Sequence, residues 1–318
     1  MKIAILDDYQ GVALRMADWS ALGKRAEIAV FTDHVSDPVA VVERLRPFEV
    51  LCVMRERTPL RREVLEQLPN LRMIASTGPG NASIDMTVAA ERGIVVTDTQ
   101  YRSTPTIEMT WALILGALRR IPQESHALRE GRWQTGIGSE LHGKTLGVLG
   151  LGHVGGEVAR IAQAFGMKVI AWSQNLTAEA AQAAGATLVT KDELLAQADI
   201  VSVHLILSRR TRGLLGAREL ALLKPTAWLI NTSRGPIVDQ AALISALRAK
   251  AFAGAALDVY DEEPLPKDHP FRSLENVLAM PHMGYVSEEL YRTFYRDVVE
   301  RITAWLDSHE RGAAPAAE

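Results

Sequence analysis

The sequence predicts an α/β protein with two doubly wound parallel sheets, each in its own domain. Short runs rich in Val and Ile alternate with amphipathic segments along the whole chain, which is typical of buried parallel strands joined by helices. The 318 residues, 47% of them hydrophobic, provide enough material for two ordinary cores.

The composition excludes several classes of function. The formal net charge is −3 and no long basic run occurs, so we expect no nucleic-acid partner. No apolar stretch reaches the roughly 18 residues of a membrane span, and the short apolar start of the chain does not resemble a signal peptide. We therefore expect a cytoplasmic protein. The histidines lack metal-ligand spacing, so we expect no metal, and Cys52 has no partner for a disulfide.

Each domain is predicted from its own series of strands. In the first domain, residues 38–45 and 60–68 have helical spacing, with Pro59 suited to a helix start. Residues 104–120 form a long apolar helix that bridges two domains or lines a dimer interface. The tail after Asp307 is small and polar, and we expect it to be loose. The expected strands are residues 3–6, 28–31, 50–53, 73–76 and 94–97, then 145–149, 168–172, 200–204, 227–231 and 254–258.

A glycine-rich loop follows the expected strand at residues 145–149 and precedes a helix at 154–165. Gly150, Gly152 and Gly155 have the spacing GxGxxG. The first glycine permits a tight turn, the second lets the backbone approach a pyrophosphate, and the third lets the helix pack closely on the strand. The order of strand, glycines and helix predicts a dinucleotide site.

The residue expected to distinguish NAD from NADP is Ser173, at the end of the next strand. An acidic side chain there would bind the ribose 2′-hydroxyl and repel a 2′-phosphate. Ser173 does neither, and it is followed by neutral Gln174 and Asn175. The sequence is therefore compatible with either NAD or NADP as the cofactor.

Three further segments carry polar side chains suited to carbonyl reduction. Arg234 lies in a polar turn after an apolar strand, and its planar guanidinium can bind a carboxylate and the neighbouring carbonyl oxygen together. His282 can donate a proton to an alkoxide. Glu263, after the strand that ends at Asp258, is the carboxylate that would orient His282 and favour its protonated form.

These residues resemble the D-isomer-specific 2-hydroxyacid dehydrogenase family, which includes phosphoglycerate dehydrogenase and the glyoxylate and hydroxypyruvate reductases. The resemblance covers nearly the whole chain. It is carried by Gly150 to Gly155, by residues 223–225 and 231–235, by Asp258 to Tyr260 with Glu263-Pro264, and by Pro281-His282.

The resemblance implies hydride transfer between NAD(P)(H) and a small D-2-hydroxy or 2-oxo acid. Arg234 would then bind the substrate, His282 would exchange the proton, and Glu263 would hold the histidine. Asp258 would hold the nicotinamide carboxamide. The cofactor-binding positions would be Thr77, Thr106, Gly150, Gly152, His153, Val154, Gly155, Ser173, Leu205, Thr232, Ser233, Asp258 and Gly284.

The family also implies a homodimer in which a Rossmann nucleotide domain is inserted into a flavodoxin-like substrate domain. We therefore expect residues 1–98 and 287–318 to form the substrate-binding domain, and residues 99–286 to form the NAD(P)-binding domain. A protein of this fold that senses NAD(H) as a corepressor, with little turnover, is the alternative function. Rapid turnover would distinguish the enzyme from the sensor.

The chain departs from the family where the substrate loop is expected. Residues 76–85 have small side chains where relatives have acids. The N–H groups of Gly78 and Gly80 are expected to cradle a carboxylate, whereas Pro79 cannot donate one. Arg55 and Arg57 are both candidates for the substrate's far end, and Arg55 is preferred because it lies closer to the strand.

Overall fold

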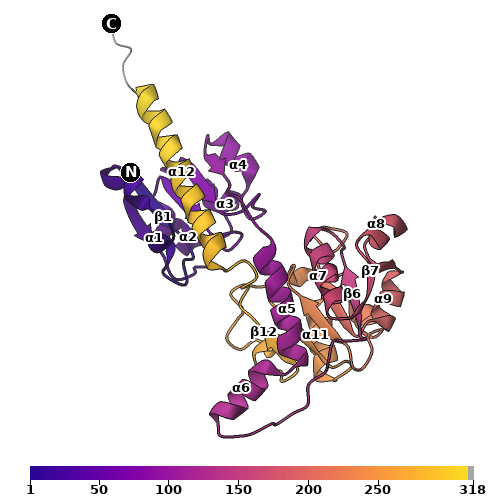
Figure 1. The fold of residues 1–318 in the computed structure, drawn as a ribbon. Coiled ribbons are helices and arrows are strands. Elements are labelled where there is room, and N and C mark those ends of the chain that lie inside the picture. Colours follow the sequence, from indigo (N-terminus) through magenta and orange to yellow (C-terminus); the bar gives the residue numbers. More distant parts are fainter. Residues whose placement is uncertain (314–318) are drawn as a thin grey trace. The chain divides into compact units, whose positions relative to one another are not determined.

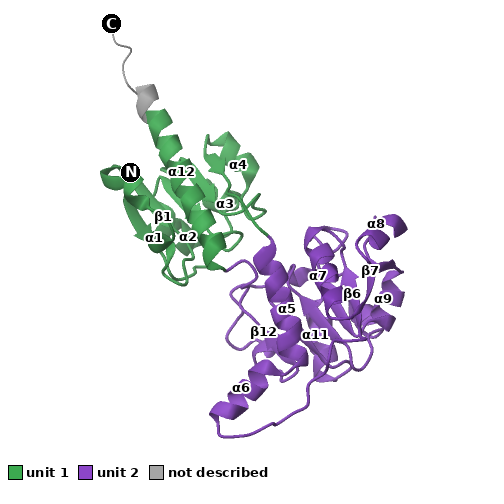
Figure 2. Ribbon diagram, in the orientation of Figure 1, with its two compact units in different colours: residues 1–102, 287–318 green, residues 103–286 purple. Residues whose placement is uncertain are grey.

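The computed structural model describes residues 1–313 and divides into two compact units (Figure 1, Figure 2). Unit 1 comprises Met1–Arg102 and Ser287–Glu318, and unit 2 comprises Ser103–Val286. Residues 99–102 lie with unit 1 because they contact its other parts. The Gln100 N–H donates to Asp297 at 2.9 Å, and Tyr101 stacks on Phe294 with ring centroids 6.5 Å apart.

Unit 1 contains a five-stranded parallel sheet, as predicted. The strand order makes β1 the neighbour of both β2 and β3, so the chain changes direction across the sheet at this point. The carboxyl ends of β1 and β3 therefore lie together at the topological switch point. The strands, in sheet order, are β2 (Glu27–Val30), β1 (Lys2–Ile5), β3 (Val50–Val53), β4 (Met73–Ser76) and β5 (Val95–Thr97).

Two helices of unit 1, α2 and α4, begin at capping aspartates, and one helix prediction is corrected. Asp37 caps α2 by accepting the Ala40 N–H at 3.0 Å, and Pro38 occupies the first turn. The helix expected at 60–68 is shorter because the Leu60 carbonyl accepts the Asp85 N–H at 2.9 Å, and because the N–H groups of Gln67 and Leu68 donate to carbonyls only three residues back. The helices are α1 (Ala13–Met16), α2 (Pro38–Leu45), α3 (Arg62–Leu65), α4 (Met86–Glu91) and α12 (Glu288–Ala313), with single turns η1 (Trp19–Ala21) and η2 (Gly23–Arg25).

The expectation of a loose tail after Asp307 is wrong for the part that the structure describes. Helix α12 continues from Glu288 to Ala313. Its buried side chains, including Phe294, Val298 and Ile302, recur with helical spacing and hold it against unit 1. Residues 314–318 of the expected tail lie outside the described part of the chain.

Unit 2 contains a seven-stranded parallel sheet in which β6 and β9 flank the switch point. Its five predicted strands are present within a residue at each end. The strands β8 and β12 were not predicted, because two and three residues at the sheet edges carry little apolar pattern. In sheet order they are β12 (Val277–Ala279), β11 (Gly254–Leu257), β10 (Trp228–Asn231), β9 (Ile200–Val203), β6 (Thr145–Leu149), β7 (Lys168–Trp172) and β8 (Thr187–Leu188).

Helices cover both faces of this sheet, and successive strand residues enter opposite cores. Leu229 belongs to the core under α9 and α11, whereas Ile230 belongs to the core under α5 and α7. Parallel strands place all their carboxyl ends at one edge, where the following loops gather. The helices are α5 (Thr104–Leu118), α6 (Ile121–Arg129), α7 (His153–Ala164), α8 (Ala178–Ala183), α9 (Lys191–Gln197), α10 (Ala217–Leu220) and α11 (Gln240–Arg248), with single turns η3 (Gly235–Ile237) and η4 (Pro270–Arg272).

Candidate active site

The glycine loop connects β6 to α7 at the switch point, and two of its glycines are required by packing. Gly150 has φ +98°, which favours glycine, and a Cβ there would lie 2.8 Å from the His204 carbonyl carbon. A Cβ on Gly155 would overlap the carbonyl oxygen of Gly150. These two residues bring the start of α7 close to the ends of β6 and β9.

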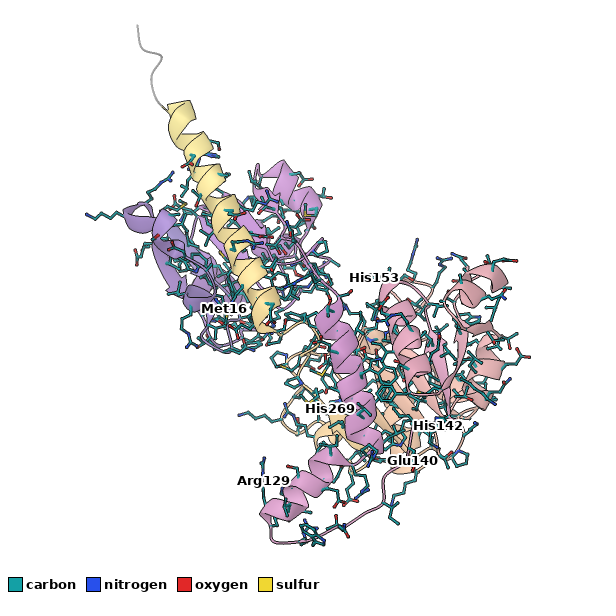
Figure 3. The ribbon with its side chains drawn as sticks, in the orientation of Figure 1. Met16, Arg129, Glu140, His142, His153 and His269 are labelled. Carbon is teal, nitrogen blue, oxygen red and sulfur yellow. The ribbon has the colours of Figure 1, made fainter. Side chains whose placement is uncertain are left out.

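Gly152 differs from its neighbours, because nothing in the protein requires a glycine at this position. Its φ is −84°, which any residue adopts, and a Cβ would meet no atom within 4 Å. His153 begins α7 immediately afterwards and is labelled in Figure 3. The open space at Gly152 and the N-terminal N–H groups of α7 together fit a pyrophosphate.

The loops after β7 and β9 lie on either side of this helix start. Ser173, Gln174 and Asn175 follow β7 and carry no charge. Ser233 donates its hydroxyl to the Leu205 carbonyl, which ties the loop after β9 to the loop after β10. Burial lowers the pKa of His204 to about 4, so its ring is neutral near pH 7.

Arg234 lies in the loop after β10, and a buried asparagine determines how this loop turns. The Asn231 side-chain amide donates to the Arg234 carbonyl at 3.0 Å and accepts the Ser233 N–H at 3.0 Å. The Arg234 Nη1 donates to the Ser233 carbonyl at 2.8 Å, and the side chain is partly exposed. The role of Asn231 in holding this loop was not predicted from the sequence. A polar residue that ends an apolar run was the available signal.

His282 and Glu263 form the hydrogen-bonded pair that the sequence predicts. His282 Nδ1 lies 2.5 Å from Glu263 Oε2, and the two side chains are 27% and 32% exposed. The other oxygen, Oε1, accepts the Tyr260 N–H at 2.9 Å, which fixes the carboxylate. The ring of Tyr285 packs edge-on against the imidazole at 5.4 Å. Because Nδ1 faces Glu263, Nε2 is the nitrogen that can meet a substrate oxygen.

Asp258 holds the segment that follows His282. Its two carboxylate oxygens accept the N–H groups of Met283 and Gly284, each at 2.7 Å. Burial raises the pKa of Asp258 to about 6, although both hydrogen bonds oppose the shift. A Cβ on Gly284 would lie 2.9 Å from Asp258 Oδ2, so this close approach requires a glycine.

Two threonines of α5 connect the loops that carry Arg234 and His282. The Thr106 hydroxyl donates to the Gly284 carbonyl at 2.9 Å, and the Thr110 hydroxyl lies 2.8 Å from that of Thr232. Thr110 also donates to the Thr106 carbonyl at 2.8 Å, which uses its single proton. Thr232 is therefore the donor in the pair, and its oxygen presents only lone pairs to a ligand.

The role of Thr110 in this arrangement was not predicted from the sequence. It is fully buried in the otherwise apolar stretch of α5. A hydroxyl at such a position needs a hydrogen-bond partner, and this requirement was the available signal.

The expected substrate loop lies in unit 1, and the structure corrects one expectation about it. The Gly78 N–H donates to the Thr99 hydroxyl at 2.7 Å, so it cannot cradle a carboxylate as expected. The Thr77 hydroxyl accepts the backbone N–H of Arg55 at 2.9 Å. The backbone N–H of Thr77 donates to the Val53 carbonyl at 3.0 Å. Gly80 has φ +59° and open space at its Cβ position.

The two candidate arginines after β3 have different surroundings. The Arg55 guanidinium packs on the substrate loop, where its Nη1 donates to the Thr77 carbonyl at 3.1 Å and would overlap a Cβ on Gly78. Arg57 instead donates to the Asp7 carbonyl at 2.7 Å and lies 4.4 Å above the Tyr9 ring. Arg55 is therefore the arginine that belongs to the loop of Gly78.

The sheet order of unit 2, the glycine loop at its switch point and the polar loops beside it define a nucleotide-binding dehydrogenase fold. Residues 111–284, more than half of the chain, match the family model described as "D-isomer specific 2-hydroxyacid dehydrogenase, NAD binding domain". The chain belongs to the D-isomer specific 2-hydroxyacid dehydrogenase family, which confirms the predicted resemblance.

Curated relatives and solved structures agree with this assignment. A glyoxylate reductase of Aeropyrum pernix is 44% identical over 237 residues, 71% of each chain. A D-3-phosphoglycerate dehydrogenase of Methanocaldococcus jannaschii is 36% identical over 95% of this chain, which spans only 57% of that relative's length. The structure of a phosphoglycerate oxidoreductase from Vibrio cholerae superimposes with a TM-score of 0.92 at 38% identity, covering 97% of this chain and 99% of the other.

Proposed function

We propose that the protein reduces a small 2-oxo acid to the D-2-hydroxy acid with a nicotinamide cofactor, and catalyses the reverse reaction. The observation that carries this proposal is the His282–Glu263 hydrogen bond of 2.5 Å beside the Arg234 loop, at the sheet edge that also bears the glycine loop. An imidazole held through Nδ1 leaves Nε2 for a proton transfer, and a guanidinium binds the carboxylate that every 2-oxo acid carries.

The proton and the substrate are handled by residues of unit 2. When bound, the nicotinamide cofactor supplies the hydride for the carbonyl carbon. Arg234 binds the substrate carboxylate and orients the neighbouring carbonyl. His282 donates the proton from Nε2 to the carbonyl oxygen, so that hydride and proton together convert C=O to CH–OH. Glu263 holds the imidazolium, whose charge it complements until the proton leaves.

The fit of the cofactor rests on the open space at Gly152 and the uncharged loop at Ser173. Gly150, Gly152, His153, Val154 and Gly155 would hold the pyrophosphate at the start of α7. We propose that the ribose lies at Ser173, where neither NAD nor NADP is repelled. Leu205, Thr106, Thr232, Ser233, Asp258 and Gly284 would surround the nicotinamide half, and the acceptor oxygen of Thr232 suits the carboxamide N–H.

For the substrate's far end we propose Arg55, Pro79 and Gly80 of unit 1, with Gly78 shaping the loop through its closeness to Arg55. Unit 1 would then be the substrate-binding domain and unit 2 the NAD(P)-binding domain. The names of the relatives suggest glyoxylate, or the 2-oxo acid formed from 3-phosphoglycerate, as the substrate.

We also propose that the protein is a cytoplasmic homodimer whose interface includes the arm formed by α6 and the segment after it. Four large apolar side chains on this arm are exposed, which is unusual for a surface that stays in water. The four side chains are Ile121 (55% exposed), Leu128 (59%), Trp133 (77%) and Ile137 (97%).

No helix within residues 1–313 carries an apolar stretch suited to a membrane span.

The test is NADH oxidation and, separately, NADPH oxidation with glyoxylate, hydroxypyruvate, phosphohydroxypyruvate, pyruvate and 2-oxoglutarate. Rapid turnover of one cofactor and acid pair is expected. Tight cofactor binding with no turnover of any acid in the panel would favour the NAD(H)-sensing alternative.

Size-exclusion chromatography with light scattering tests the dimer. The double variant Trp133→Ser with Ile137→Ser is expected to shift the protein toward monomer.

A further inference from the structure

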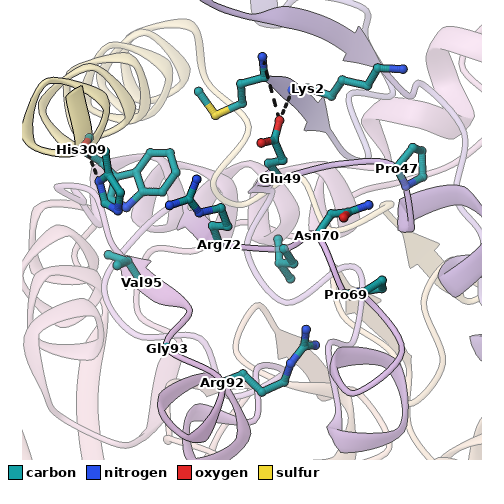
Figure 4. A pocket seen from close by; sticks show the side chains of 13 residues that line it. Lys2, Pro47, Glu49, Pro69, Asn70, Arg72, Arg92, Gly93, Val95 and His309 are labelled. Atoms are coloured by element: carbon teal, nitrogen blue, oxygen red, sulfur yellow. Dashed lines mark hydrogen bonds and ion pairs between the residues drawn. The ribbon is translucent and has the colours of Figure 1, made fainter. Parts of the chain in front are cut away.

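The cavity of about 760 Å³ in unit 1 lies at the amino ends of the strands (Figure 4). Its lining residues Lys2, Glu49, Arg72 and Val95 begin or directly precede β1, β3, β4 and β5. Arg55 follows β3 at the opposite edge of the same sheet. The cavity is therefore a strand length away from the loops at the carboxyl edge, where side chains that serve a reaction gather in such sheets.

Tyr260 lies at the carboxyl edge of the unit 2 sheet and contacts all three loops that carry the proposed catalytic residues. Its backbone N–H donates to Glu263 Oε1 at 2.9 Å. Its hydroxyl donates to the Met280 carbonyl at 2.8 Å, two residues before His282. A Cβ on the glycine that follows Arg234 would overlap the Tyr260 carbonyl group. One residue thus joins the surroundings of the whole proposed site.

The backbone of His282 explains why this turn needs support. Its φ is +53°, in the left-handed region that is unfavourable for a residue with a Cβ. Such a conformation persists only where the surroundings enforce it. The Met280 carbonyl accepts the His282 N–H at 3.0 Å and the Tyr260 hydroxyl, which uses both of its lone pairs. Asp258 holds the two N–H groups that follow His282, so the turn is fixed on both sides.

The Tyr260 hydroxyl is a lasting donor to this turn. It has one proton, and the Met280 carbonyl is the nearer acceptor. The Leu257 carbonyl lies 3.2 Å away and already accepts the Met280 N–H at 2.8 Å. Burial raises the pKa of Tyr260, and the carboxylates of Asp258 and Glu263 raise it further. The hydroxyl therefore stays protonated throughout the neutral pH range.

We propose that Tyr260 is a positioning residue, which holds His282 in line with Glu263 through its hydroxyl and its backbone N–H. The inference rests on the proposed function, because it assigns Tyr260 to the proton transfer by His282. The side chain is only 7% exposed, so Tyr260 acts through the histidine and not by contact with the substrate. Loss of the hydroxyl removes the side-chain support of the turn and changes the contact between the imidazole and Glu263.

The variant Tyr260→Phe removes the hydroxyl alone. It keeps the N–H on Glu263 and the ring, whose centroid lies 6.2 Å from that of Phe271. We expect kcat to fall about tenfold, since a poorly aligned imidazole slows proton transfer, while the KM of the acid and the cofactor dissociation constant stay within about twofold. Loss of packing alone would not separate kcat from KM in this way.

The matched control is Tyr295→Phe in unit 1. Tyr295 is 1% exposed, and its hydroxyl has no hydrogen-bond partner within the described part of the chain. This variant also removes one buried hydroxyl, but it breaks no hydrogen bond to a proposed site loop. Its kcat should equal that of the wild type.

The ring nitrogens of His282 provide a readout that needs no turnover. Two-bond ¹H–¹⁵N correlations of histidine-labelled protein report both nitrogens, and His282→Ala assigns this ring among the eight histidines. We expect the Nδ1 resonance to move in Tyr260→Phe and to stay in place in Tyr295→Phe. An unmoved Nδ1 resonance overturns the inference, as does a wild-type kcat in Tyr260→Phe. Absence of turnover in the wild type contradicts the proposed function instead, and the Nδ1 resonance then still decides the role of Tyr260.

Discussion

The polar loops at the carboxyl edges of the two sheets are held in different ways. In unit 2, a buried side chain supports each loop that carries a proposed catalytic residue: Asn231 turns the loop of Arg234, and Asp258 holds the segment after His282. In unit 1, the loop of Gly78 is held by the buried Thr99 hydroxyl and also by Arg55, whose guanidinium is a candidate ligand for the substrate. The first arrangement suits a reaction that is common to all substrates, whereas in the second one of the supporting side chains is also the proposed substrate contact.

This difference predicts that changes in unit 2 abolish the reaction for every substrate, whereas changes in unit 1 alter which substrate is used. The largest effect is expected for Arg234→Ala. Two charge-assisted hydrogen bonds at about 2 kcal/mol each correspond to about a 1,000-fold loss in kcat/KM. The loss should be similar for all 2-oxo acids because all share the carboxylate. Steady-state kinetics across the panel measure it, and a loss confined to one acid would contradict the role.

Glu263→Gln is expected to lower kcat by about 10 to 100-fold, since one hydrogen bond to a charged group is lost. The matched control is Glu262→Gln, which removes the neighbouring exposed acid. Cofactor affinity, measured by fluorescence titration, should stay unchanged in both variants. Equal kcat values for the two variants would show that Glu263 does not orient His282.

Arg55→Ala is expected to lower kcat/KM about tenfold or more for phosphohydroxypyruvate, and less than about threefold for glyoxylate, which has no tail to bind. Arg55→Lys should restore part of the difference because it keeps the charge. A uniform loss for both acids would mean that Arg55 serves the common chemistry, and the contrast between the two units would then fail.

Smaller effects are expected for two glycines of the cofactor loop, Gly152 and Gly155, which differ in whether the cofactor or the protein requires them. Gly152→Ala meets no protein atom within 4 Å, so stability should be unchanged while the cofactor dissociation constant rises about tenfold. Gly155→Ala overlaps the Gly150 carbonyl oxygen and should lower the free energy of unfolding by about 1 to 3 kcal/mol. Denaturant unfolding and cofactor titration measure both effects. A stable Gly155→Ala variant would contradict the packing described at this turn.

The sequence was sufficient to predict features that depend on local constraints. The two parallel sheets follow from apolar runs of four or five residues, and the glycine loop follows from the strand before it and the helix after it. The pairing of Glu263 with His282 could be predicted because the resemblance to the family assigned a role to each residue.

Other features depend on contacts between distant residues, which local patterns do not specify. The Gly78 N–H is occupied by Thr99, 21 positions further along the chain, and the bond between Thr110 and Thr232 spans 122 positions. The edge strands β8 and β12 exist because neighbouring strands pair with them. The continued helix after Asp307 likewise follows from a helix that already packs on unit 1.

The most direct test of the central claim compares binding and turnover in one preparation of His282→Ala. The dissociation constant of the reduced cofactor is measured by fluorescence, and turnover is measured with the best acid of the panel. The proposed role of His282 predicts a dissociation constant within about threefold of wild type and turnover reduced about 1,000-fold. Equal losses of both would indicate a structural role, and wild-type turnover would show that another group supplies the proton.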